Sequence, residues 1–191
     1  MVKIIDIGVG NLLSLHFSLL SANIENKIIT KPEQISDGDT IILPGVGSIR
    51  LYMKLLKKKN FEKKIKHHFK NNFKLIGICI GMHALSEFSS EDGGINCMNI
   101  IKTKVVKMTE GQNNGWNKIS LPRKYFKKRI NGRVFYNHEY GMIKNNFRSY
   151  SINIPGKQYI SFIKKKNFYG LQFHPEKSQK TGIEILKRLI S

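Results

Sequence analysis

The segment around Cys79 has the residue types of a strained turn that presents a nucleophile. The run at 74–78, which is apolar after Lys74 and typical of a buried strand, leads directly into Cys79, and Gly77 and Gly81 flank the thiol at two residues on either side. Glycines at these positions allow a tight turn that lifts a side chain above a sheet, as in hydrolase nucleophile elbows. A helix starting here would favour the thiolate, the form that attacks carbonyl carbons. A structural cysteine in a tight turn explains the same residues.

A histidine and a glutamate near the C-terminus supply the other groups that such a thiol needs. In the sequence Gln172-Phe173-His174-Pro175-Glu176, the histidine follows a predicted strand and the glutamate lies two residues later. Residues i and i+2 of an extended segment point to the same side, so the carboxylate is expected to orient the imidazole. The sequence therefore predicts a catalytic triad, with Cys79 as nucleophile, His174 as base and acid, and Glu176 as the orienting group.

A glycine-rich loop after another predicted strand is a candidate oxyanion hole. Gly45, Val46 and Gly47 follow Leu43-Pro44, and glycines let backbone N–H groups adopt the unusual conformations that such a site requires. The N–H of Ile80, directly after the candidate nucleophile, is expected to be a second donor. An ordinary Pro-Gly turn is the alternative for the loop.

The elements that must position these groups alternate between short β-branched runs and longer amphipathic stretches. This alternation predicts an α/β fold with a mostly parallel sheet flanked by helices, followed by antiparallel additions in the C-terminal half. We expect one domain over residues 1–191. The predicted strands are 2–7, 27–30, 40–43, 74–79, 100–108, 133–136, 158–163 and 168–173; the predicted helices are 11–22, a Lys-rich stretch around 51–73, and 181–190.

Composition narrows the functional classes. The chain has 33 basic and 13 acidic side chains, a net charge of +20, but the lysines are dispersed and no arginine-rich stripe or nucleic-acid-binding motif is present. We therefore expect no nucleic-acid partner. The sequence has no apolar run near the ~20 residues that span a bilayer and no secretory signal, so we expect no membrane association and a cytoplasmic location.

Across nearly its whole length, the sequence resembles the class I (triad) glutamine amidotransferases. Within them it is most similar to the glutaminase subunits of imidazole glycerol phosphate synthases. The segments that carry the resemblance are Ile4 to Leu12, the loop at 44–47, the turn around Cys79, Gly115-Trp116-Asn117, and Gln172 to Ser178.

The resemblance implies roles for further residues and a partner. It implies the class I glutamine amidotransferase fold, and a heterodimer with a (β/α)8-barrel synthase subunit that receives ammonia through an internal channel, with no metal or cofactor. The positions that match the binding site for L-glutamine are His83, Glu91, His138, Glu139 and Tyr140. The positions that match the partner-facing surface are Asn11, Trp116 and Lys177.

Three departures from the family pattern leave the function open. His83 replaces a glutamine and Glu139 a serine in regions that hold the substrate, and Asn113-Asn114 replaces a His-Met pair near the partner interface. The His83 substitution predicts that glutamine binding depends on pH near ~6.5, the ordinary histidine pKa. The expected function is glutamine hydrolysis for histidine biosynthesis. The alternatives are ammonia supply for amidation of a surface-polysaccharide sugar, or a catalytically weak subunit that stabilises its partner.

Overall fold

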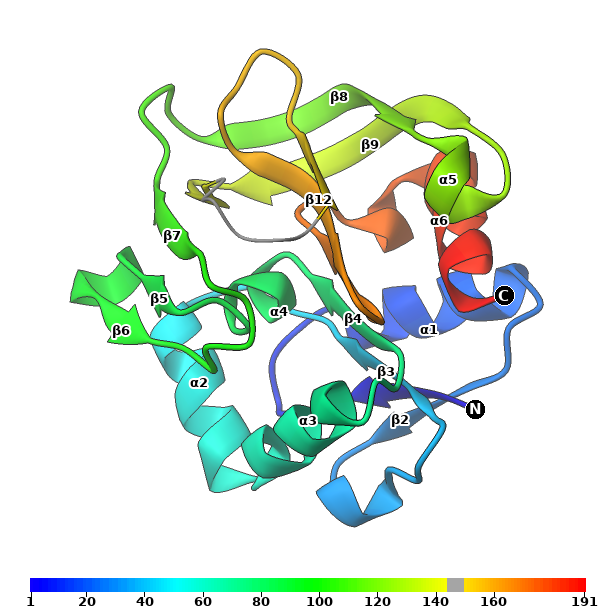
Figure 1. Cartoon of the computed structure of the whole chain (residues 1–191), viewed down its shortest axis with the longest axis vertical. Helices are drawn as coiled ribbons and strands as arrows, with labels where there is room; N and C mark the ends of the chain where they lie inside the picture. The colour runs from blue at the N-terminus through cyan, green and yellow to red at the C-terminus, as the bar shows by residue number, and fades with distance from the viewer. Residues whose placement is uncertain (144–149) are drawn as a thin grey trace.

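A seven-stranded sheet forms the centre of the computed structural model, which describes residues 1–143 and 150–191 (Figure 1). Its strands are β1 (Val2–Ile5), β2 (Asn26–Ile29), β3 (Thr40–Leu43), β4 (Leu75–Ile78), β11 (Tyr150–Asn153), β12 (Ile160–Lys165) and β13 (Phe168–Leu171). They lie in the order β11-β12-β13-β4-β3-β1-β2. All neighbours from β13 to β2 are parallel, whereas β11 and β12 are antiparallel additions.

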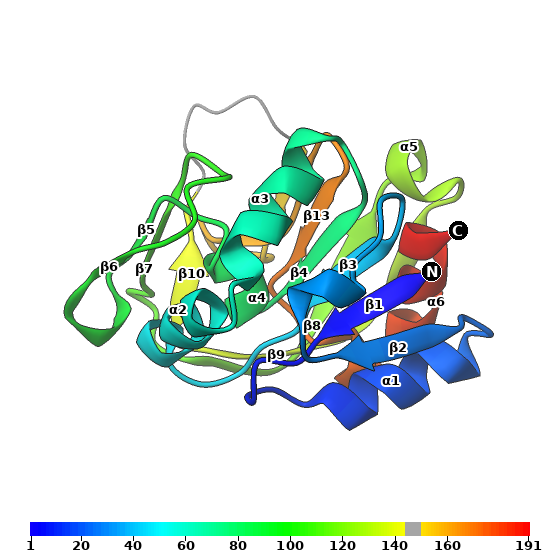
Figure 2. The same cartoon turned by 90° about the horizontal axis from the view of Figure 1, so that it is seen from below.

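Helices cover both faces of this sheet because its central strands are apolar on both sides. The longer helices are α1 (Leu12–Ser21), α2 (Ile49–Lys58), α3 (Phe61–Lys70) and α6 (Gln179–Ile190). Alternate residues of one strand enter different cores: Ile41 packs with α2 and α3, and Ile42 packs with α1 and α6. Figure 2 shows α1 across the sheet from α2 and α3. Parallel sheets are ordinarily buried in this way.

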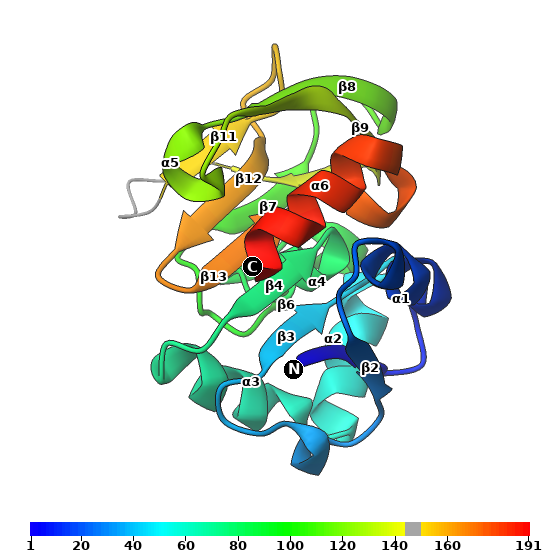
Figure 3. The ribbon, with the colours of Figure 1, turned by 90° about the vertical axis from the view of Figure 1, so that its right-hand side faces the viewer.

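Two smaller sheets complete the fold. The long hairpin of β8 (Asn113–Leu121) and β9 (Ile130–His138), joined through α5 (Arg123–Phe126), lies beside α6 (Figure 3). A four-stranded sheet contains β5 (Phe88–Ser89), β6 (Ile95–Asn96), β7 (Lys104–Lys107) and β10 (Tyr140–Met142). The remaining short helices are α4 (Ile80–His83), η1 (Pro32–Gln34), η2 (Glu91–Gly93) and η3 (Pro175–Lys177). Of these, α4 directly follows the carboxyl end of β4, and η3 follows β13.

The predicted fold class is confirmed, with differences at the ends of elements. The strands expected at 2–7, 74–79 and 168–173 end earlier than predicted, and the one expected at 100–108 shrinks to Lys104–Lys107. The Lys-rich stretch forms two helices separated at Asn60, which has a positive φ of 59°. In the described part of the chain, no helix is long and apolar enough to cross a bilayer.

Candidate active site

Cys79 occupies a strained backbone conformation between β4 and α4. Its φ and ψ are 51° and −113°, which is rare for a residue with a side chain, and its own N–H donates to Leu171 O at 2.7 Å. Such strain persists only where the surroundings fix the backbone, and it is common at functional sites. The structure therefore supports the predicted nucleophile turn, with the strain at Cys79 itself.

The flanking glycines act by close packing. A Cβ atom on Gly81 would lie 1.9 Å from Leu43 O, so only glycine lets α4 approach β3 this closely.

The expected stabilisation of the thiolate by a helix dipole needs correction. The helix after Cys79 has only four residues, so few peptide dipoles add together at its N-terminus.

His174 lies beside Cys79 because β13 pairs in parallel with β4. Leu171 is opposite Ile78 in the register, so the residues that follow both strands meet at one edge of the sheet. The His174 backbone is fixed by β9: its N–H donates to Phe135 O at 2.9 Å. Ser178 Oγ donates to His174 O at 2.6 Å and accepts from Phe135 N at 3.0 Å. Ser178 is thus a supporting residue to which the sequence pattern gave no role.

The imidazole of His174 has the contacts of a catalytic base. Its Nδ1 lies 2.9 Å from Glu176 Oε1, and both side chains are buried. Its Nε2 is buried without a hydrogen-bond partner among the described residues, which leaves it available to the thiol. Burial alone would lower the pKa of His174, but the nearby Cys79 and Glu176 outweigh it and raise the pKa. This arrangement favours the imidazolium form of His174 beside the thiol.

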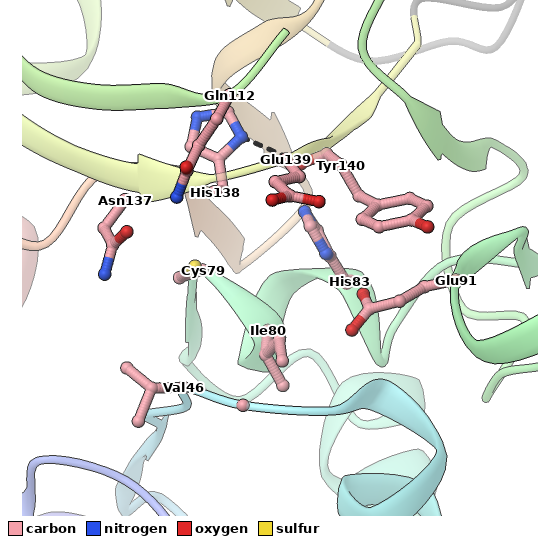
Figure 4. Close-up of a pocket in the computed structure, with 11 residues that line it drawn as sticks. Val46, Cys79, Ile80, His83, Glu91, Gln112, Asn137, His138, Glu139 and Tyr140 are labelled. Carbon is pink, nitrogen blue, oxygen red and sulfur yellow. Dashed lines mark hydrogen bonds between the residues drawn. The ribbon is translucent and has the colours of Figure 1, made fainter.

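A pocket of about 270 Å³ opens beside the thiol (Figure 4). Its lining residues are Val46, Gly47, Cys79, Ile80, His83, Glu91, Gln112, Asn137, His138, Glu139 and Tyr140. Figure 4 shows Val46 and Ile80 on one side of the thiol, with His138 and Asn137 on the other. All five residues predicted to bind substrate line this pocket, but no bound molecule tests that role.

The acidic side of the pocket carries Glu91 and Glu139. On a chain of net charge +20, this pocket presents two carboxylates and no Lys or Arg among its described lining residues. Burial raises the pKa of Glu91, an effect partly opposed by the hydrogen bond that Glu91 Oε1 accepts from Ile49 N at 3.4 Å. An acidic wall of this kind complements a substrate that carries an ammonium group.

The candidate oxyanion loop packs directly against the nucleophile turn. A Cβ atom on Gly45 would lie 2.9 Å from the Tyr52 ring and 3.0 Å from the Ile80 side chain, so this close packing requires glycine. Tyr52 Oη donates to Pro44 O at 2.7 Å and fixes the start of the loop. Val46 and Gly47 then reach the pocket beside Ile80. Their roles as oxyanion donors remain predictions.

Comparison with known proteins identifies the family. A family model described as "Glutamine amidotransferase class-I" matches residues 3–190. The chain belongs to this family. One relative, the "Imidazole glycerol phosphate synthase subunit HisH" of Blochmanniella pennsylvanica (strain BPEN), is 37% identical over 196 residues, covering 99% of this chain and 98% of the relative. The protein of the same name from Listeria monocytogenes serovar 1/2a is 35% identical over 201 residues, covering 98% and 93%.

Solved structures agree with this family at the level of the fold. A structure described as "Crystal structure of glutamine amidotransferase" matches with a TM-score of 0.78 at 15% identity, covering 97% of this chain and 96% of the other. "Structure of PurLQS from Thermotoga maritima" matches with a TM-score of 0.77 at 16% identity, covering 99% and 96%. The family model and the curated relatives confirm the resemblance to class I glutamine amidotransferases that was inferred from the motifs.

In this family member, the two histidines of the pocket are buried and neutral. Burial lowers the pKa of His83 to about 4, against a smaller opposing effect of its hydrogen bond to Gln172. Burial, followed by the nearby His83, lowers the pKa of His138 to about 3. The expectation that His83 makes glutamine binding pH-dependent near 6.5 is therefore wrong, because a surface pKa does not apply to this imidazole.

Acidification from pH 7 to pH 5 is expected to destabilise the fold through these two histidines. The unfolded chain binds their protons below about pH 6.5, whereas the folded chain excludes them until about pH 4 or 3. The free energy of unfolding is therefore unaffected by these histidines well above pH 6.5. It decreases as the pH is lowered, by about 2 kcal/mol per histidine at pH 5. Urea unfolding at both pH values measures this, and His83→Gln should reduce the difference. Equal stability at pH 5 and 7 would contradict neutral burial.

Two of the three predicted partner-facing residues, Trp116 and Lys177, lie beside the ring of Phe135. Trp116 is exposed and its ring centroid lies 5.9 Å from that of Phe135, while Lys177 Nζ lies 5.7 Å from the same ring. Asn11 precedes α1, which packs beside η3. Contact with a partner remains a prediction for all three residues.

Asn113 is oriented differently from the sequence-based expectation. It is buried, and its Nδ2 lies 3.3 Å from His138 Nε2, while the Nδ1 of the same imidazole is 2.8 Å from Tyr140 O. Asn113 therefore supports the pocket wall, whereas its neighbour Asn114 is exposed. The substitution of this Asn-Asn pair changes the site as well as the surface.

Proposed function

We propose that this chain is the glutaminase subunit of an imidazole glycerol phosphate synthase. It would hydrolyse L-glutamine and deliver the ammonia to a (β/α)8-barrel synthase subunit in a heterodimer, for histidine biosynthesis. The observation that carries the proposal is the strained Cys79 beside the buried His174–Glu176 pair, in a chain that aligns end to end with subunits named HisH. The expected cytoplasmic location remains a prediction.

In the proposed mechanism, Cys79 forms and breaks the covalent bond to substrate. Its thiolate attacks the carboxamide carbon of glutamine, and the resulting oxyanion accepts hydrogen bonds from N–H groups of the Gly45–Gly47 loop and of Ile80. The imidazolium of His174 donates its Nε2 proton to the departing ammonia. The same nitrogen then accepts a proton from the water that hydrolyses the thioester to glutamate.

The charge of the pocket supports glutamine as the substrate. The α-ammonium group of an amino acid would lie favourably near Glu91 and Glu139, while the side-chain amide reaches Cys79. Val46 and Ile80 lie on the other side of the thiol from His138 and offer apolar surface, and their backbone N–H groups are candidate oxyanion donors. The geometry therefore favours a neutral carboxamide at the thiol and a cation at the far end of the pocket.

The synthase subunit is expected to accelerate glutamine hydrolysis. If the Gly45–Gly47 loop needs the partner to aim its donors, adding the synthase subunit and its acceptor should raise turnover by about 10²- to 10³-fold, the usual effect of one oxyanion donor. The measurement is glutamate release with the synthase subunit from the same organism. Equal activity of the isolated chain would contradict partner control.

The same assay separates the proposal from its alternatives. A subunit that serves polysaccharide amidation would not respond to the barrel synthase, and a catalytically weak subunit would bind the synthase without releasing glutamate. Trp116→Ala should weaken the response because this exposed ring lies on the predicted interface. Lys54→Ala, an exposed change on α2, is the control and should leave the response unchanged.

A further inference from the structure

Gln172, at the end of β13, connects a pocket histidine to the nucleophile. Its side chain is fully buried, and both ends of its amide have partners. Oε1 lies 2.8 Å from His83 Nε2, and Nε2 lies 3.8 Å from Cys79 Sγ. The three side chains thus form a continuous hydrogen-bonded chain that reaches the sulfur from the side of α4.

The chemistry of the amide oxygen fixes the protons in this chain. A carbonyl oxygen only accepts, so His83 Nε2 must carry the hydrogen, and the imidazole is the neutral Nε2–H tautomer. His83 Nδ1 is then a bare acceptor, and it is buried without a partner among the described residues. A proton on Nδ1 is disfavoured by the same burial. The donor at Nε2 is therefore present throughout the neutral pH range.

This donor selects one of two orientations of the Gln172 amide. Turned by 180°, the amide would donate to His83 Nε2 and place its carbonyl oxygen against Cys79. His83 would then carry its hydrogen on the buried, unpartnered Nδ1, which costs more than a bare nitrogen there, and the carbonyl oxygen would repel a thiolate. With His83 donating to Oε1, the NH₂ group faces the sulfur, where an N–H stabilises negative charge.

We propose that His83 is a positioning residue that holds the Gln172 amide with its N–H toward Cys79, and that this contact favours the thiolate. The inference rests on the proposed function only in taking Cys79 as the nucleophile. His83 lines the pocket as well, so substrate binding and thiol positioning are compatible roles for it. Among the described residues that line the pocket, the other ionisable side chains are His138, Glu91, Glu139 and Tyr140, and His174 lies beside the thiol.

The test is the pKa of the Cys79 thiol, measured on the full chain without glutamine. The rate of alkylation by iodoacetamide is followed across pH, with peptide mass spectrometry to separate Cys79 from Cys97. Gln172→Met removes the amide, and His83→Leu removes the donor. Each should raise the thiol pKa by about one unit, a roughly tenfold loss of thiolate below the pKa. His83→Gln, which keeps an N–H, should restore the wild-type value.

The double variant distinguishes positioning from separate effects. Because His83 acts through Gln172, adding His83→Leu to Gln172→Met should change the thiol pKa no further. An unchanged pKa in His83→Leu, or additive shifts in the double variant, would overturn the inference. Cys97 is the internal control, since its alkylation rate rises if a variant loosens the fold. If a variant does loosen the fold, Gln172→Glu is the substitute test. It keeps the acceptor for His83 but places an oxygen in place of the N–H against the sulfur, so it must raise the thiol pKa by more than one unit.

Failure of this inference can be told apart from failure of the proposed function. Alkylation requires no glutamine, so a chain without glutaminase activity would still report the thiol pKa. Conversely, normal glutamine hydrolysis together with an unchanged thiol pKa in His83→Leu would support the proposed function and contradict only the role of His83.

Discussion

Replacing Cys79 by alanine is expected to lower glutamine hydrolysis by at least about 10⁵-fold, because no other group at the site can form the thioester. The Cβ atom remains in the turn, so the fold and partner binding should persist. Glutamate release measures the loss in the complex with the synthase subunit. Synthesis driven by added ammonium salts should be unchanged, because that reaction bypasses the triad.

The second thiol provides the matched control for this prediction. Cys97 is half-buried, lies after β6, and is raised in pKa by burial, so it is a poor nucleophile. Cys97→Ala should retain activity, and a thiol-alkylating glutamine analogue should label Cys79 alone. Labelling of Cys97, or activity in Cys79→Ala, would show that the nucleophile is assigned to the wrong residue.

Loss of the base is the second large effect expected. His174→Ala should slow glutamine hydrolysis by about 10⁴-fold or more, since the imidazole moves protons in both half-reactions. The loss of turnover in Glu176→Gln should be about 10²-fold smaller than that in His174→Ala, because the carboxylate only orients and stabilises the imidazolium. The same variant should also lower the pKa of His174, whose raised value depends partly on Glu176. The alkaline limb of the pH–rate profile, where the imidazolium of His174 loses its proton, reports that change.

The control for these two variants is His67→Ala, which removes an exposed histidine on α3 that does not line the pocket. It should leave turnover and the pH profile as in the wild type. If Glu176→Gln were as damaging as His174→Ala, the carboxylate would have a role in proton transfer beyond orientation.

The chemistry of the triad was predictable from sequence because it depends on short segments. A strand, a tight turn and a histidine after a second strand define the positions of Cys79 and His174 once the two strands are neighbours. The contact between His174 and Glu176 was also predicted, but for a different reason. Pro175 starts a short 3₁₀ turn, η3, so the carboxylate reaches back to Nδ1 from a turn and not along an extended strand.

Features that depend on packing between distant segments were not predictable in the same way. The buried face of α2 consists of Ile49, Tyr52, Met53 and Leu56, whereas Leu51 on the same helix is exposed. The nine-residue strand β8 was missed because its residues are mostly polar on both faces. Its pairing with β9 supplies the backbone partners that its own sequence does not reveal.

The position of Gln172 near the thiol can be predicted from the sequence, but its contact with His83 cannot. It lies two residues before His174, so in an extended segment the two side chains share a face. Its position near the thiol follows from that spacing, but its contact with His83 requires the packing of α4 against β13. The neutrality of His83 is likewise a consequence of burial that composition alone does not report.

The most direct test of the account follows the nitrogen atom. The chain and its synthase subunit are incubated with amide-¹⁵N-glutamine and excess unlabelled ammonium, and the imidazole glycerol phosphate formed is examined by mass spectrometry. With wild-type chain, we expect ¹⁵N in the imidazole ring; with Cys79→Ala, we expect the same product without the label. Unlabelled product from the wild-type complex would contradict the central claim that this subunit supplies the ammonia.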